Sequence, residues 1–134
     1  MNHVSIMGRL TADPKITETQ EGKKIVRFRV AVPDGFSNNR EPLAVFLNCV
    51  YFSKGSKDST PDNMAKYCKK GNYIGVIGKL TVRSYISKAD GLEKEVTEIQ
   101  AFSIDYVFDR SNMESAQEEK SQAPNTMEVP EMVY

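Results

Sequence analysis

The segment Gly71–Tyr85, GNYIGVIGKLTVRSY, contains cations and aromatic rings but no acidic residue, although Asp and Glu account for 18 of the 134 residues. With the two-residue period of a strand, Lys79, Arg83 and Tyr85 share one face. Tyr73 joins that face if no bulge intervenes. Cations and rings suit a ligand that offers phosphates and flat, unpaired bases, whereas carboxylates would repel phosphate. The opposite face is an apolar row that is expected to lie in the core: Ile74, Val76, Leu80, Val82 and Ile86.

Outward cations also mark the segment Lys23–Pro33, KKIVRFRVAVP. Its alternation places Arg27 and Arg29 on one face, opposite apolar residues that are expected to point inward. These inward residues are Val26, Phe28, Val30 and Val32.

The rings of the almost wholly apolar segment Leu43–Phe52 cannot all be buried in one small barrel. Phe46 and Phe52 share one face of this expected central strand, and Tyr51 lies on the other. Only one face can point inward, so the other is exposed or covered by a partner. Phe36 is a further candidate ring, because it lies in the polar loop PDGFSNNREP, where no core is expected.

Outward rings interleaved with Arg and Lys predict the binding of single-stranded nucleic acid. Duplex DNA fits less well, because no segment indicates a basic recognition helix and paired bases hide their faces. Two other interpretations stay open on the residues alone. The rings could form the subunit interface of a protein-interaction barrel, or the arginines could be the solvated face of an unrelated small β domain. An RNA ligand would differ by its 2′-hydroxyl.

Five strands and one helix are expected to position these residues. The helix is indicated between the third and fourth strands, with Thr60 as the capping residue, Pro61 in the first turn and Gly71 closing it. Gly75 and Gly78 allow the following strand to bulge or coil. This order predicts an all-β fold, a five-stranded Greek-key barrel of the OB type with one short helix. The strands are indicated at residues 3–10, 23–33, 43–52, 72–87 and 95–108.

Charge divides the chain into a basic body and an acidic tail. Residues 1–110 hold 17 of the 18 Lys and Arg and 13 of the 18 Asp and Glu, a net charge of +4, and residues 111–134 carry −4. Such asymmetry is typical of proteins with a polyanionic partner. The tail is rich in Ser, Gln, Glu, Asn and Pro, so we expect one folded domain over residues 1–110 and a disordered segment over 111–134.

The residues give little support to catalysis. His3 is the only histidine, which removes Ser–His and His–metal arrangements. GNYIGVIGK lacks the spacing of a phosphate-binding loop, and its glycines are expected to serve the curvature of the barrel. The acids beside the last turn are expected to form a solvated rim: Glu93, Glu95 and Glu98. We therefore expect no enzyme activity, no metal and no cofactor.

Cysteine usage and hydropathy predict a cytoplasmic setting. Cys49 and Cys68 lie inside predicted elements without metal-binding spacing, which indicates core thiols in a reducing compartment. The first residues do not resemble a secretory signal, and no apolar run is long enough to cross a membrane.

Taken segment by segment, the sequence resembles the bacterial and phage single-stranded DNA-binding proteins. The likeness covers roughly residues 1–107 and lies in NHVSIMGRLTADPKI, IVRFRVAV, MAKYCKKGNYIGVIGKLTVRSY and DGLEKEVTEI. Members of this family are OB folds that wrap single-stranded DNA on aromatic platforms. The resemblance implies a non-catalytic, sequence-tolerant protein that coats exposed strands during replication, recombination and repair.

The resemblance also implies roles for individual residues. The aromatic platforms would be Phe36, Phe46, Phe52 and Tyr85, three of which (Phe36, Phe46 and Tyr85) replace residues that are often tryptophan in the family. Weaker stacking per base is therefore expected. The basic contacts would be Lys54, Lys69, Lys70 and Arg83, with Arg27 and Arg29 on the sheet face and Tyr73 nearby. Lys79 joins this predicted DNA-binding set by strand alternation alone.

Family members usually form homotetramers in which first strands pair across a dimer, and HVSIM has the alternating character of such an edge strand. Their acidic tail ends in a Pro–aromatic pair that recruits replication and repair proteins. The corresponding residues here would be Glu128, Pro130, Glu131 and Tyr134, with fewer acids than is typical.

Overall fold

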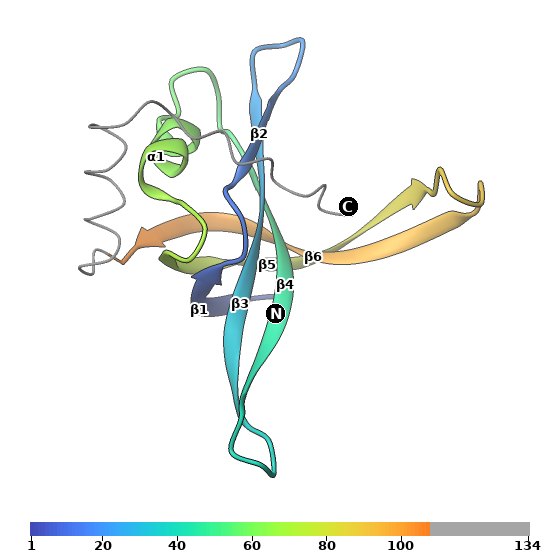
Figure 1. Cartoon of the computed structure of the whole chain (residues 1–134). Coiled ribbons are helices and arrows are strands. Elements are labelled where there is room, and N and C mark those ends of the chain that lie inside the picture. The colour runs from blue at the N-terminus through green and yellow to red at the C-terminus, as the bar shows by residue number, and fades with distance from the viewer. Residues whose placement is uncertain (108–134) are drawn as a thin grey trace.

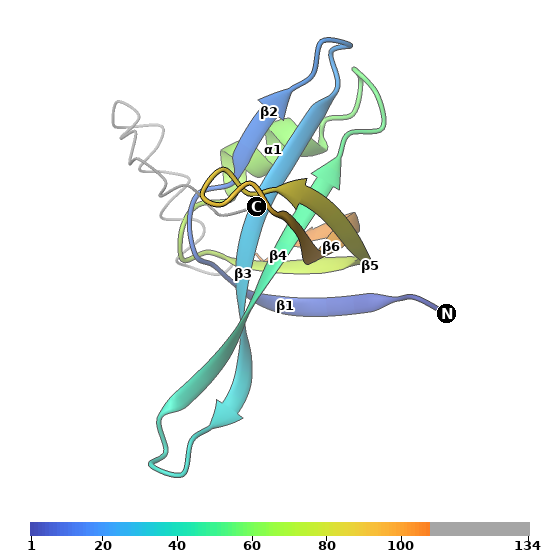
Figure 2. The ribbon, with the colours of Figure 1, turned by 90° about the vertical axis from the view of Figure 1, so that its right-hand side faces the viewer.

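The computed structural model describes residues 1–107 as six strands and one helix (Figures 1 and 2). The expected strands and helix are present in the expected order, and the additional strand is the four-residue segment KITE, which pairs with the start of the next strand. The predicted tail and its tip lie outside the described residues. The elements are β1 Val4–Leu10, β2 Lys15–Glu18, β3 Lys24–Phe36, β4 Pro42–Phe52, α1 Thr60–Tyr67, β5 Tyr73–Ile86 and β6 Glu93–Tyr106.

Five strands close into a barrel because β1 pairs on two sides. It pairs antiparallel with β5 from Val4 to Arg9, and at Arg9 and Leu10 it also pairs with β3. The order β5–β6–β4–β3 completes the ring, with β4 and β6 parallel, and β2 extends the sheet beside β3. This arrangement confirms the predicted barrel with a helix between its third and fourth barrel strands.

The core is built from the inward rows that strand alternation predicts. Val26, Phe28 and Val30 of β3 are fully buried. On β4 the buried row includes Cys49 and Tyr51, so Phe46 and Phe52 of the same strand lie on the outside. Met64 of α1, Ile74 and Val76 of β5, and Ile99 and Ala101 of β6 complete the interior.

Both cysteines are free thiols in this core. Burial raises the pKa of the Cys49 thiol and that of the Cys68 thiol to about 12. Both side chains therefore stay protonated and unreactive near neutral pH.

The start of α1 is fixed by Asp58 rather than by the predicted cap at Thr60. Ser59 occupies the N-cap position and forms no side-chain capping bond. Asp58 instead accepts hydrogen bonds from the Thr60 N–H (3.0 Å), the Tyr51 hydroxyl (2.6 Å) and the Lys54 N–H (2.9 Å). Partial burial alone would raise the pKa of Asp58, but these bonds outweigh it and hold the pKa well below its usual value.

The helix is shorter than predicted, because it ends at Tyr67 and its C-cap is Cys68 rather than Gly71. It has 8 residues, and no helix of the described part is long and apolar enough to span a membrane.

Two hairpins extend beyond the barrel (Figure 1). The β3–β4 ladder runs from Ile25 opposite Phe52 to Phe36 opposite Pro42, so much of the predicted loop is strand. The β5–β6 ladder continues to Ile86 opposite Glu93.

The apolar row of β5 is therefore only half buried. Ile74 and Val76 lie in the core, but Leu80, Val82 and Ile86 are 48%, 62% and 72% exposed. The prediction that these three side chains join the core was wrong, because β5 pairs with β1 only up to Gly78 and then continues into the free hairpin.

Two glycines allow the close strand crossings that closure requires. A Cβ at Gly8 would collide with the backbone of Ala31 in β3, and a Cβ at Gly78 would collide with the backbone of Gln100 in β6. The β5–β6 register shifts between Ile77 and Gly78, which confirms the predicted bulge.

Candidate nucleic-acid interface

The outward residues of β3 and β4 lie side by side because the two strands pair in register. Arg29 is opposite Asn48, and Ala31 is opposite Phe46. Paired residues of an antiparallel ladder project from the same side of the sheet. Two arginines of β3 therefore border two phenylalanines of β4: Arg27, Arg29, Phe46 and Phe52.

This surface continues across the sheet onto β6 and β5. Val50 of β4 is level with Gln100 of β6, which is opposite Lys79 of β5. Farther along the same face of β5, Arg83 is opposite Val96. The register thus brings seven predicted residues to one continuous surface, which we call the ring-and-cation face: Arg27, Arg29, Phe46, Phe52, Lys79, Arg83 and Tyr85.

Cations and rings on this face are in contact. The guanidinium carbon of Arg29 lies 5.1 Å from the ring centroid of Phe46, and that of Arg83 lies 5.7 Å from the ring centroid of Tyr85. Both distances are within the range of cation–π attraction. Phe46 and Phe52 are 53% and 43% exposed, so their rings are available to a ligand.

Phe36 stands apart at the end of the β3–β4 hairpin, where it is 73% exposed. The ladder shifts register between Pro33 and Phe36, and Gly35 adopts a φ of +81°, a conformation that glycine accepts without strain. Phe36 is thus the last residue of β3, in the hairpin that extends beyond the barrel, and most of its side chain is exposed.

The ring-and-cation face also contains an acid that the sequence did not predict there. Glu98 of β6 is opposite Thr81 and is only 4% exposed, so the prediction that it belongs to a solvated rim was wrong. Its Oε1 lies 3.3 Å from Nε of Arg83. Glu93 and Glu95, nearer the tip of the hairpin, are exposed as predicted.

Four predicted residues lie away from this face or at its margin. Tyr73 is at the other end of β5, opposite Arg9, whose guanidinium carbon lies 4.1 Å from the ring centroid. Lys69 and Lys70 follow α1, in a turn whose backbone bonds to the end of β1. Lys54 follows β4, two residues after Phe52, and its side chain is exposed.

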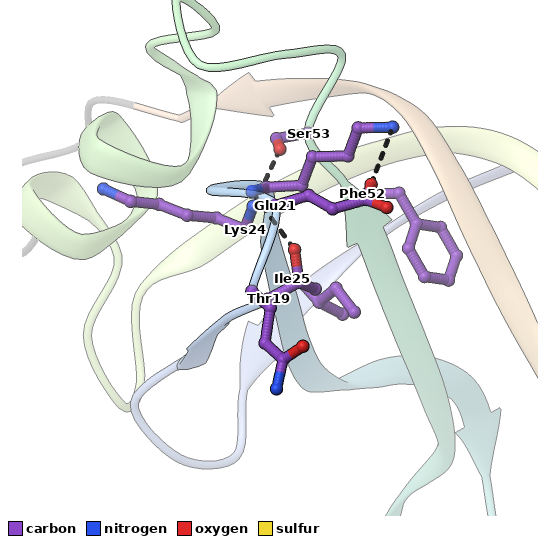
Figure 3. A pocket seen from close by; sticks show the side chains of 8 residues that line it. Thr19, Glu21, Lys24, Ile25, Phe52 and Ser53 are labelled. Atoms are coloured by element: carbon purple, nitrogen blue, oxygen red, sulfur yellow. Dashed lines mark hydrogen bonds and ion pairs between the residues drawn. The ribbon is translucent and has the colours of Figure 1, made fainter.

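An open pocket of about 430 Å³ adjoins the face at Phe52 (Figure 3). Its cations are paired: Nζ of Lys24 lies 2.9 Å from Oδ1 of Asp62, and Nζ of Lys23 lies 3.9 Å from Oε2 of Glu21. The pocket therefore offers room beside the ring rather than net positive charge. It is lined by Thr19, Gln20, Glu21, Lys23, Lys24, Ile25, Phe52 and Ser53.

Two features of the site escaped the sequence-based prediction. Glu98 could be recognised only from the pairing of β5 with β6, because its partner Arg83 is 15 residues away. The sequence contains only a weak indication of Arg9, which is the one Lys or Arg on the outward side of the first strand. Within residues 1–107, no group of three or more His, Cys, Asp or Glu side chains could hold a metal ion.

The Single-strand binding protein family matches residues 1–107 of this chain. The single-stranded DNA-binding protein of Bacillus cereus is 38% identical over 112 residues, which are 83% of this chain and 62% of that protein. The chain thus spans less than two thirds of the length of this relative. Single-stranded DNA-binding protein 1 of Lactococcus lactis is 32% identical over 137 residues, 97% of this chain and 87% of the relative.

A solved structure of the Plasmodium falciparum SSB in complex with ssDNA has the same fold, with a TM-score of 0.67 and 22% identity over 81% of this chain and 96% of that one. At this identity the likeness is one of fold. The family match, in contrast, covers all the residues that form the barrel and its two hairpins. The chain belongs to the single-strand binding protein family.

Proposed function

We propose that this protein is a non-catalytic, sequence-tolerant binder of single-stranded DNA. The observation that carries the proposal is the ring-and-cation face, where aromatic rings and cations from β3, β4 and β5 share one continuous surface. The names of the curated relatives and the ssDNA in the related solved complex support it.

The geometry suits stacking better than base-edge reading. The rings of Phe46, Phe52 and Tyr85 provide platforms for unpaired bases, with Phe36 as a fourth on the projecting hairpin. Each stacked base contributes about 1–3 kcal/mol, and stacking tolerates any sequence because every base has a π-face. Neighbouring cations such as Arg29 and Lys79 follow the phosphates. Beyond the ring-and-cation face, Lys54, Lys69, Lys70 and Tyr73 would contact DNA only if the strand wraps around the barrel.

In the cell, such a protein would coat exposed strands in the cytoplasm during replication, recombination and repair. We further propose that the tail tip, with Glu128, Pro130, Glu131 and Tyr134, contacts replication or repair proteins. Removal of these residues should then abolish partner binding while leaving DNA binding intact.

We also propose a homo-oligomer, with a tetramer as the expected form. Two observations favour it: the exposed apolar row of Leu80, Val82 and Ile86, and the edge of β1. Within residues 1–107, β1 has β5 along one edge, but β3 pairs with its other edge only at Arg9 and Leu10. Light scattering coupled to gel filtration measures the state directly, and a monomer at micromolar concentration would contradict the proposal.

Titration with oligothymidine tests the main proposal. The chain has 6 tyrosines and no tryptophan, so intrinsic tyrosine fluorescence reports binding without a label. We expect a saturable change at low salt that weakens as salt is added, because binding releases counterions from the DNA. A duplex of equal length should bind less tightly, and oligouridine tests the RNA alternative. Absence of binding to oligothymidine at low salt would refute the proposal and favour a protein-interaction barrel.

A further inference from the structure

Glu98 is a buried carboxylate in the middle of a surface that is otherwise made of rings and cations. Its side chain is 3% exposed, whereas the side chain of its partner Arg83 is 31% exposed. The Glu98 backbone carbonyl accepts a hydrogen bond from the Thr81 hydroxyl (3.3 Å), within the same β5–β6 ladder. The carboxylate is thus almost completely shielded from water, whereas the guanidinium that contacts it stays partly exposed.

A carboxylate in this position is costly for a protein that binds polyanions. Burial removes water from the charged group, and only a close cation offsets that loss. It also places a negative charge within the field of any phosphate that approaches Arg83. Because low-dielectric surroundings screen this charge weakly, the negative charge of Glu98 cancels most of the attraction between Arg83 and a phosphate. The Arg83–Glu98 pair therefore acts on phosphate as a nearly neutral unit.

The pair also fixes the orientation of the guanidinium. Nε of Arg83 lies 3.3 Å from Oε1 of Glu98, and the guanidinium carbon is 5.7 Å from the ring centroid of Tyr85. The planar guanidinium therefore contacts both a carboxylate and an aromatic ring. A flat guanidinium stacks on bases as an aromatic ring does.

Building on the proposed function, we propose that Glu98 is a positioning residue that neutralises Arg83 and sets it beside Tyr85 as a stacking platform for a base. Arg83 then makes no phosphate contact of its own, unlike Arg29, which stands over Phe46 with no carboxylate within ion-pair distance among the described residues. The acid-free segment Gly71–Tyr85 is thus in contact with a carboxylate from the neighbouring strand β6.

The salt dependence of DNA binding tests this assignment, because its slope counts the phosphates that protein cations neutralise. For single strands each phosphate contributes about 0.7 to the slope of log K against log salt. We would measure the slope by anisotropy of a labelled oligothymidine with the wild type, Glu98→Gln, and the double variant Arg83→Gln/Glu98→Gln. Arg29→Gln is the matched variant for loss of a cation that has no carboxylate neighbour.

We expect Glu98→Gln to steepen the slope by about 0.7, because the freed Arg83 then gains a phosphate. Near 1 M salt, phosphate contacts contribute little to binding. The same variant should then bind more weakly than the wild type, because its Arg83 guanidinium is no longer held beside Tyr85 as a stacking platform. The double variant should keep the wild-type slope while binding more weakly at every salt concentration. A merely structural role for Glu98 would leave the slope of the single variant unchanged.

Two results would overturn the assignment: an unchanged or flatter slope for Glu98→Gln, or a slope flattened by about 0.7 in the double variant. Thermal melts check that each variant folds. If the single variant does not fold, the double variant decides alone, because it replaces the ion pair by a neutral pair. Failure of the wild type to bind oligothymidine would refute the proposed function instead.

Discussion

Replacement of Phe46 by alanine separates DNA binding from stability in this fold. The ring lies on the outward face of β4, is 53% exposed, and has the Arg29 guanidinium carbon 5.1 Å from its centroid. If one base stacks on it, Phe46→Ala should weaken binding by about 1–3 kcal/mol, or roughly 5- to 150-fold in Kd. Slightly less than half of the side chain is buried, so the free energy of unfolding should fall by only about 1 kcal/mol.

The matched control is Val45→Ala. Val45 is the preceding residue of the same hairpin and is 41% exposed, but its side chain projects from the opposite face. Anisotropy of a labelled oligothymidine at one fixed salt concentration gives the affinity of each variant, and thermal melts give the stability. We expect Val45→Ala to lose stability comparable to Phe46→Ala while keeping the wild-type affinity.

Equal losses of affinity in the two variants would show that the two faces of β4 do not differ in function and would refute the stacking role of Phe46. Wild-type affinity of Phe46→Ala would refute it as well. A variant that unfolds would show that the ring contributes more to the barrel than its exposure indicates.

Three further outcomes are expected. Gly78→Ala should destabilise the fold by about 1–3 kcal/mol or prevent folding, because its Cβ would collide with the backbone of Gln100. Gly75→Ala should be milder in thermal melts, because the nearest atom to its Cβ would be the Asp105 Cβ at 3.1 Å and the backbone stays at ordinary contact distance. The pKa of Asp58 is lower in the folded than in the unfolded state, so the ionised carboxylate stabilises the fold above about pH 4, and this stabilisation is lost on acidification. Thermal melts from neutral to acidic pH should therefore show a smaller pH dependence for Asp58→Asn than for the wild type. Deletion of residues 111–134 removes a net charge of −4 and should preserve or raise the affinity for oligothymidine; loss of binding would contradict a tail that is dispensable for DNA binding.

Alternation along each strand was sufficient to assign faces but not to decide whether anything covers them. Phe28 and Val82 both occupy positions predicted to point inward, yet one is fully buried and the other 62% exposed. The difference arises because the pairing of β5 with β1 ends at Gly78, and β5 continues beyond it. How far a hairpin extends beyond a barrel depends on the relative lengths of the paired strands. The sequence of one strand by itself does not give this information.

The candidate site was predictable to the same extent. The outward positions of Arg29, Phe46 and Tyr85 follow from strand period, and the register adds that they belong to one surface. The burial of Glu98 depends on Arg83 across the ladder, so its role could not be inferred from its place beside a turn. The strand β2 was missed because KITE contains a single apolar residue and no alternation to detect.

The two core cysteines supply an internal probe of how the barrel opens. Since each thiol is buried with a pKa near 12, an alkylating reagent can react only during moments when the surrounding structure separates. Cys49 lies in the central strand β4, whereas Cys68 lies at the end of α1. Faster labelling of Cys68 than of Cys49 would therefore show that the helix detaches while the barrel stays closed. Equal rates would show that the helix and barrel unfold as one cooperative unit.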